Sequence, residues 1–261
     1  MTPDLLIEQS WKITLIIHAC LILRLSRMPT RPPHFFRWLV FGFGYSFVGS
    51  VLGVKSPLYS SLYIVGQTID VILAFFVTKE ILDQTYVSYP GLRVLGNRLL
   101  RWSAFTAIGS GCLAVPVTIR WWSSPYYACV GFTLAEFTRF LNLAYVVFMA
   151  VMYFRLRTLP IRLGRYTELH GSLWLFLLLS NVLTSCVSLY MHSKHMNVFL
   201  DVYMLAQGTI CYIAWIILFN VKPAYMGNRV YTRPSTQSET VGKLARLTQL
   251  CNVVLHREDY Q

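Results

Sequence analysis

The sequence predicts an all-α integral membrane protein, a bundle of seven transmembrane helices with its N-terminus outside and its C-terminus in the cytoplasm. Three observations lead to this prediction. Apolar residues make up 55% of the 261-residue chain and charged residues only 13%, whereas soluble domains average about 25% charged residues. Seven mostly apolar windows approach the roughly 20 residues that a helix needs to cross a bilayer core. Most Lys and Arg residues lie in alternate connections between these windows.

The seven windows form the expected transmembrane domain, residues 1–222. The first window is the weakest because Glu8 and Lys12 lie inside it, although their four-residue spacing favours an ion pair near the membrane surface. Four Arg residues follow this window directly. Such a cluster resists crossing the membrane, so we expect a retained helix rather than a cleaved signal peptide. The expected spans are residues 5–23, 36–54, 59–78, 102–119, 128–154, 171–190 and 197–219.

Basic residues set the expected orientation. The connections 24–37, 79–101 and 155–165 and the C-terminal tail hold most of the 23 Lys and Arg residues. Because cytoplasmic connections retain Lys and Arg, this pattern places the N-terminus outside. The net charge of +12 therefore reports orientation and contact with anionic lipids, and we expect no nucleic-acid partner. Aromatic residues such as Trp38 and Trp102 mark the expected inner boundaries of their spans.

The tail, residues 223–261, differs from the rest of the chain. Val241, Leu244 and Leu247 recur near one helical face, with basic residues between them. This pattern predicts an amphipathic helix over about 239–256 that lies on the inner membrane surface. A docking site for a cytoplasmic partner protein is the alternative interpretation.

Small residues indicate where helices pack closely. Gly49 and Gly53 in the second span, and Ala107 and Gly111 in the fourth, are each separated by four residues and so share a helix face. Such pairs let two backbones approach each other in a bilayer, where the hydrophobic effect contributes little to helix association. We expect these faces to pack inside the bundle, with a homodimer interface as the alternative.

Ionisable residues inside spans are functional-site candidates, because burying them without a partner is costly. The third span holds Gln67 and Asp70, the fifth holds Glu136 and Arg139, and the seventh holds Asp201. These three spans all run from outside inwards, so we expect an outward-facing polar pocket between them for a small polar ligand or an ion. The alternative is a structural network in which Arg139 pairs with Glu136 on its own turn and with Asp70 across the bundle.

These features favour a receptor-like or sensory membrane protein, with a transporter of an ion or small polar solute as the alternative. A membrane-embedded enzyme is the third hypothesis, and the sequence shows no nucleophile–base pattern to carry it. We predict no metal or other cofactor. The six Cys residues lack metal-ligand spacing, His18 is the only mid-span histidine, and the last span has no Lys to hold retinal.

A series of polar and turn residues runs from the third span into the next connection. It consists of Gln67-Thr68-Ile69-Asp70, Lys79-Glu80-Ile81-Leu82, Tyr89-Pro90-Gly91-Leu92 and Leu95-Gly96. This stretch resembles a group of short bacterial seven-helix membrane proteins of unassigned function. The resemblance implies a bacterial cytoplasmic (inner) membrane and assigns no activity. On physical grounds, Tyr89-Pro90-Gly91 predicts a turn before a basic segment, residues 93–101, that leads into the fourth span.

Two substitutions separate the leading hypotheses. For a receptor-like protein, we expect a small molecule to raise the melting temperature of the purified protein and Glu136→Gln to remove that shift, because the carboxylate would belong to the pocket. Solute flux into proteoliposomes that Asp70→Asn abolishes would instead favour transport.

Overall fold

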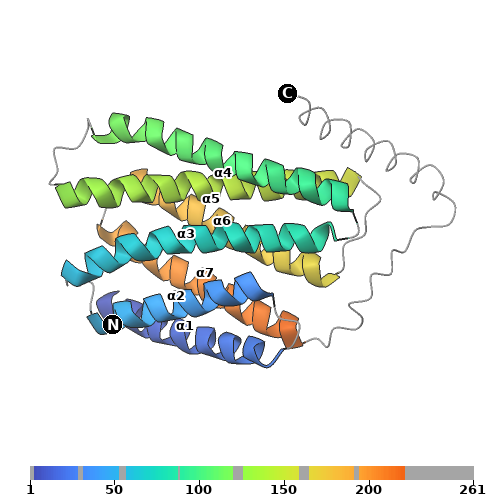
Figure 1. The fold of residues 1–261 in the computed structure, drawn as a ribbon. Coiled ribbons are helices and arrows are strands. Elements are labelled where there is room, and N and C mark those ends of the chain that lie inside the picture. Colours follow the sequence, from blue (N-terminus) through green and yellow to red (C-terminus); the bar gives the residue numbers. More distant parts are fainter. Residues whose placement is uncertain are drawn as a thin grey trace, which may run out of the picture.

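The computed structural model describes residues 3–28, 32–52, 57–87, 89–119, 126–158, 165–190 and 194–220. Within these residues the chain forms seven helices and no strand, which confirms the all-helical class (Figure 1). The expected tail helix over 239–256 lies outside the described residues. The helices are α1 (Pro3–Ser26), α2 (Pro33–Leu52), α3 (Pro57–Thr85), α4 (Pro90–Ile119), α5 (Tyr126–Thr158), α6 (Arg165–Tyr190) and α7 (Lys194–Asn220).

Proline begins each of the first four helices, at Pro3, Pro33, Pro57 and Pro90. The first position of a helix suits proline, because its missing N–H has no partner there in any case and its fixed φ angle already matches the helix. The four prolines therefore set where these helices start.

Helices α3 and α4 extend well beyond the apolar windows that predicted them. Residues 93–101, expected as a basic segment before the fourth span, form part of α4. Pro90 is the first residue of α4 rather than the middle of a turn, and the backbone N–H of Arg93 donates to the carbonyl of Tyr89 (3.0 Å). The apolar window marks only the part of a helix that suits a bilayer, so a helix that projects into water continues past it.

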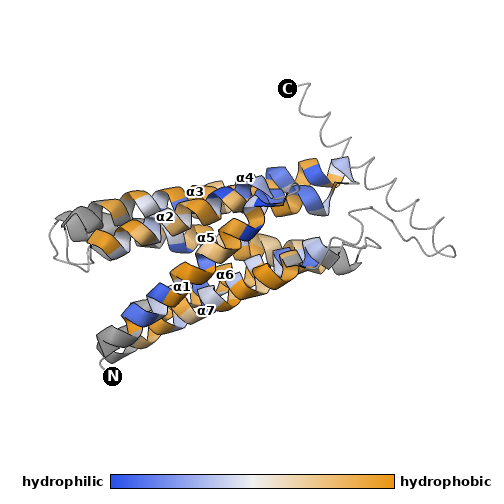
Figure 2. Cartoon of the chain, turned by 90° about the horizontal axis from the view of Figure 1, so that it is seen from below, coloured by the Kyte–Doolittle hydropathy of each residue, from blue (hydrophilic) through white to orange (hydrophobic). Residues whose placement is uncertain are grey.

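Consecutive helices run in opposite directions and lie side by side (Figure 1). Helix α3 is central and packs against α2, α4, α5 and α6. Helix α1 packs against α2 and α7, and α6 packs against α5 and α7. Figure 2 shows α1, α6 and α7 in a layer that is inclined to the layer of α2, α3 and α4.

The surface of the bundle is apolar, as expected for a protein embedded in a membrane (Figure 2). Four stretches are long and apolar enough to span a bilayer, and less than half of each is buried inside the bundle. Large side chains such as Phe105 and Leu113 in α4 are 65% and 78% exposed. Contiguous apolar surface of this extent is rare on soluble monomers. The four stretches are Pro33–Leu52, Phe137–Phe154, Tyr166–Val187 and Val202–Phe219.

Positively charged side chains gather at one end of the bundle, where α1 ends and α2 begins; we call this the basic end. The opposite end, where α1 begins, is the N-terminal end. The groups that the sequence separates into several connections therefore meet in space. The described Lys and Arg residues near the basic end are Arg24, Arg27, Arg37, Lys79, Arg93, Arg98 and Arg101.

Two helix termini at the basic end are capped by side chains from other helices. The buried Glu80 of α3 accepts hydrogen bonds from the backbone N–H groups of His34 (3.1 Å) and Phe35 (2.9 Å), in the first turn of α2. Arg24 of α1 donates to the carbonyl of Phe219 (3.3 Å) near the end of α7. Each contact satisfies backbone groups that the helix itself leaves unpaired, and each has the sign that the helix dipole favours.

Asp83 ties the end of α3 to the start of α4. Its carboxylate accepts hydrogen bonds from Lys79 (2.7 Å), Arg93 (2.6 Å) and Asn97 (3.1 Å). Partial burial acts to raise the pKa of Asp83, but these three donors outweigh it and lower the pKa to about 2. The pairing therefore stabilises the fold fully above the unfolded pKa near 4 and is lost as pH falls towards 2.

Removing the cap on α2 will destabilise the protein. We expect Glu80→Ala to lower the free energy of unfolding by about 1–3 kcal/mol, because two backbone N–H groups lose their acceptor at a buried site. Glu80→Gln keeps one acceptor oxygen and will cost less. Denaturant titration in detergent measures both, with exposed Glu168→Ala in the first turn of α6 as the control. Equal losses for Glu80→Ala and Glu168→Ala would contradict the capping role.

Candidate ligand site between helices α1, α2 and α7

Three tryptophans from three helices form the centre of the bundle, and we call them the tryptophan core: Trp38, Trp174 and Trp215. Trp38 and Trp174 pack edge to face with ring centroids 4.9 Å apart, and Trp38 and Trp215 do so at 6.5 Å. These distances and tilts are those that aromatic pairs prefer. Trp174 and Trp215 are almost completely buried.

Every indole N–H of the tryptophan core donates to a side chain on a neighbouring helix. Trp38 donates to Asp70 of α3 (2.8 Å). Trp174 donates to the hydroxyl of Thr78, also on α3 (3.0 Å), and Trp215 donates to Nδ1 of His170 on α6 (3.1 Å). A buried N–H without an acceptor is costly, so these bonds fix how α2, α3, α6 and α7 pack together.

Trp38 lies in the second turn of α2, near the basic end, and its side chain is partly buried. We expected it, with Trp102, at a membrane boundary. Trp102 is 64% exposed on the outer face of α4, consistent with that position. The side chain of Trp38 packs against the core, where Asp70 accepts a hydrogen bond from its indole N–H.

The structure gives the predicted pocket residues separate partners. Asp70 accepts its hydrogen bond from Trp38, and Arg139 donates to the backbone carbonyl of Ser185 on α6 (3.1 Å). Among the residues whose side chains are described, Asp70 and Arg139 form no ion pair with each other. Gln67 is partly buried in α3.

Two other members of the predicted pocket, Glu136 and Asp201, have side chains outside the described set. A pocket that includes them stays a prediction. The expected pair of Glu8 and Lys12 is formed near the start of α1, at 2.7 Å, with both side chains largely exposed.

The predicted packing residues occupy helix interfaces where they are described. Gly49 and Ala107 are buried. A Cβ atom at Gly111 would lie 2.7 Å from the ring of Phe137, so this glycine allows α4 and α5 to approach closely. Gly53 lies outside the described residues.

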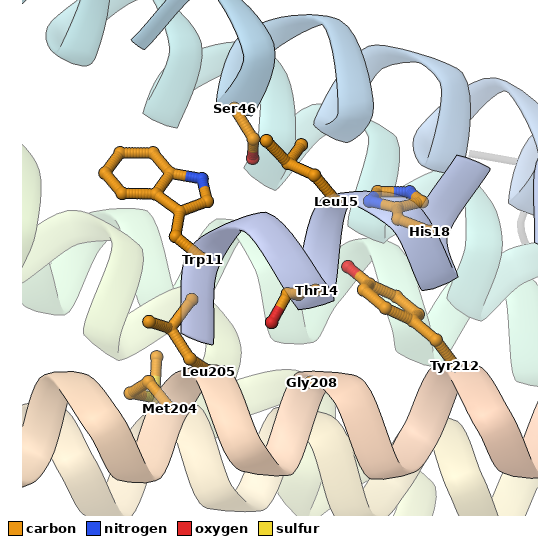
Figure 3. Close-up of a pocket in the computed structure, with 9 residues that line it drawn as sticks. All are labelled: Trp11, Thr14, Leu15, His18, Ser46, Met204, Leu205, Gly208 and Tyr212. Carbon is orange, nitrogen blue, oxygen red and sulfur yellow. The ribbon is translucent and has the colours of Figure 1, made fainter. Parts of the chain in front are cut away.

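The structure shows a cavity of about 180 Å³ between α1, α2 and α7, towards the N-terminal end (Figure 3). Gln67, Asp70 and Arg139 are not among its lining residues, and the side chains of Glu136 and Asp201 are outside the described set. Helix α1 and helix α7 contribute most of the lining and α2 contributes one residue. The lining residues are Trp11, Thr14, Leu15, His18, Ser46, Met204, Leu205, Gly208 and Tyr212.

His18 and Tyr212 close the cavity on the side of the tryptophan core. Their rings stack with centroids 4.4 Å apart, and the ring of Tyr212 lies 6.3 Å from that of Trp215. His18 is 3% exposed, and its Nε2 atom has no hydrogen-bond partner among the described residues. A histidine in the middle of a span is the signal in the sequence that could have found this site. It was considered only as a haem ligand, and that role needs a second histidine.

The other polar lining residue of α1, Thr14, is already bonded. Its hydroxyl donates to the carbonyl of Ser10 (2.8 Å) and lies 2.7 Å from the hydroxyl of Thr209 on α7. These bonds hold α1 against α7 beside the cavity and so help to fix its width.

Comparison with protein-family models, with curated proteins and with solved structures finds no match for this chain.

A double-mutant cycle measures the bond between Trp38 and Asp70. We expect Trp38→Phe to lower the free energy of unfolding by about 1–3 kcal/mol, because the Asp70 carboxylate loses its donor while the ring packing is largely kept. In an Asp70→Leu background the same change will cost less, since neither partner is then left unpaired. Trp102→Phe on the outer face is the matched control. An equal cost of Trp38→Phe in both backgrounds would show that the bond contributes nothing.

Proposed function

We propose that this chain is a receptor-like membrane protein with seven spans, which binds a small molecule in the outer half of the bilayer. Its N-terminus lies outside and its basic end faces the cytoplasm. The resemblance noted in the sequence favours a bacterial cytoplasmic membrane. The observation that carries the proposal is the cavity near the N-terminal end, closed on its inner side by packed aromatic rings.

The packing of the helices supports seven spans. Helices α1, α3 and α4 each carry at least three charged residues and are not among the four apolar stretches. They nevertheless lie alongside the other helices. The shortest of the three, α1, has 24 residues and is about 36 Å long at 1.5 Å per residue, which exceeds a bilayer core of about 30 Å.

The gathering of Lys and Arg at one end supports the orientation, because cytoplasmic ends retain these residues. The cavity then lies on the outer side, since α1 begins there and the cavity residues of α1 precede its midpoint or lie close to it.

The interior between the cavity and the basic end favours binding over transport. Transport needs polar groups that continue across the bundle or a second cavity at the other end. In the described part of the chain, the fully buried rings of Phe35, Trp174 and Trp215 fill this region. A solute that entered the cavity would meet packed aromatic side chains.

Paired cysteine substitutions test the orientation and the outward opening together. In a background without native cysteines, we expect Ser46→Cys in the cavity to react with a membrane-impermeant thiol reagent in intact cells. The matched variant Ser26→Cys, exposed at the basic end, will react only after the cells are permeabilised. The reverse pattern would overturn the orientation. Labelling of neither position in intact cells would show that the cavity is closed to the outside.

A further inference from the structure

The chemistry of the cavity between α1, α2 and α7 restricts the ligand that it accepts. We propose that the cavity binds neutral compounds of one aromatic ring that carry an oxygen hydrogen-bond acceptor, the class that includes phenols and benzaldehydes. This inference rests on the proposed function, because it names the ligand class of the same site.

The size of the cavity sets the size of the ligand. Its volume is about 180 Å³, and a protein cavity of about 150 Å³ lined by apolar side chains accommodates benzene. One ring with a small substituent therefore fills it.

The described lining residues carry no formal charge. None of the nine lining residues carries a carboxylate, ammonium or guanidinium group. Two charged residues of α1 close to the lining in sequence, Glu8 and Lys12, are largely exposed and form an ion pair with each other. The side chain of Asp201, one turn before Met204 on α7, is outside the described set. An ion that entered the cavity would lose its hydration and find no counter-charge among the described lining residues, which is unfavourable at this depth in a membrane.

Three polar groups of the lining are open to a ligand that accepts hydrogen bonds. Within the described part of the chain, the indole N–H of Trp11 and the hydroxyls of Ser46 and Tyr212 form no hydrogen bond, and the buried Nε2 atom of His18 also has no partner. Figure 3 shows the Ser46 hydroxyl directed from α2 towards α1, and the Tyr212 hydroxyl directed away from its own helix towards the same space. All three groups donate, and the indole N–H can only donate. An oxygen acceptor on the ligand satisfies them.

The remaining lining favours a flat ring. The rings of Trp11, His18 and Tyr212 border the cavity together with Leu15, Met204 and Leu205. Aromatic side chains gain energy from offset-stacked or edge-to-face contacts with another ring in addition to the burial of apolar area. A saturated chain of the same volume would gain only the burial.

Binding by the full chain in lipid nanodiscs tests the ligand class, with empty nanodiscs as the correction for partition into lipid. The three probes are benzaldehyde, toluene and benzoate, which share the ring but differ in acceptor and charge. We expect benzaldehyde to bind about tenfold more tightly than toluene, which cannot accept the hydrogen bonds. Benzoate will show no binding. Tyr212→Phe and Ser46→Ala will reduce the preference for benzaldehyde over toluene.

A matched pair of glycine substitutions tests the location. A Cβ atom at Gly208, in the cavity lining, or at Gly109, on α4, would meet nothing within 4 Å. Both positions therefore tolerate a side chain, and replacing a glycine inside a helix favours helix formation. We expect Gly208→Leu to abolish benzaldehyde binding by occupying the cavity, and Gly109→Leu to leave it unchanged.

The outcomes separate this inference from the proposed function. The proposed ligand class is wrong if toluene or benzoate binds more tightly than benzaldehyde. It is also wrong if, in a screen of a broad compound collection, only compounds outside this class bind. In both cases, if Gly208→Leu abolishes the binding that is observed, the result still supports the receptor-like function. Benzaldehyde binding that survives Gly208→Leu overturns the site. If no compound in the collection binds the protein or raises its melting temperature, both proposals are overturned.

Discussion

The fold depends on one constraint: an indole N–H inside a membrane-embedded bundle must find its acceptor within the protein. The three tryptophans of the core meet this constraint with acceptors on neighbouring helices, at Asp70, Thr78 and His170. Two of these acceptors lie on α3, which is also the helix with the most neighbours. Because lipid provides little hydrophobic drive for helix association, such directional bonds determine which helices meet and at what depth.

The two ends of the bundle differ in the side-chain contacts that join their helices. At the basic end, Glu80 and Arg24 satisfy the backbone groups of α2 and α7, and Asp83 joins α3 to α4. Towards the N-terminal end the contact between α1 and α7 includes the hydroxyl pair of Thr14 and Thr209, beside the cavity. Within the described residues, the side chains that cap helix termini thus lie at one end, and space for a ligand lies near the other.

Much of the fold follows from local pattern, and much of the site does not. The helices and the Glu8–Lys12 pair depend on residues close in sequence, so the sequence predicts them. Residues 93–101 lead into the fourth span as predicted, and they are helical themselves because charge reports distance from the bilayer rather than the end of a helix. The bond from Trp38 to Asp70 joins different helices, and only tertiary packing reveals it. The cavity is not evident from the sequence, because ionisable residues mark candidate sites inside spans and its described lining residues carry no formal charge.

The fluorescence of the tryptophan core also reports how the helices pack. Trp174 and Trp215 are shielded from water by the fold itself, while Trp102 faces outwards from α4. Indole emission shifts to shorter wavelength in apolar, rigid surroundings, and closely spaced rings exchange excitation energy. The intrinsic fluorescence of this chain therefore combines a signal from the interior with one from the surrounding lipid or detergent. Loss of the interior signal while the helical content persists would identify a state in which the helices remain inserted but have separated.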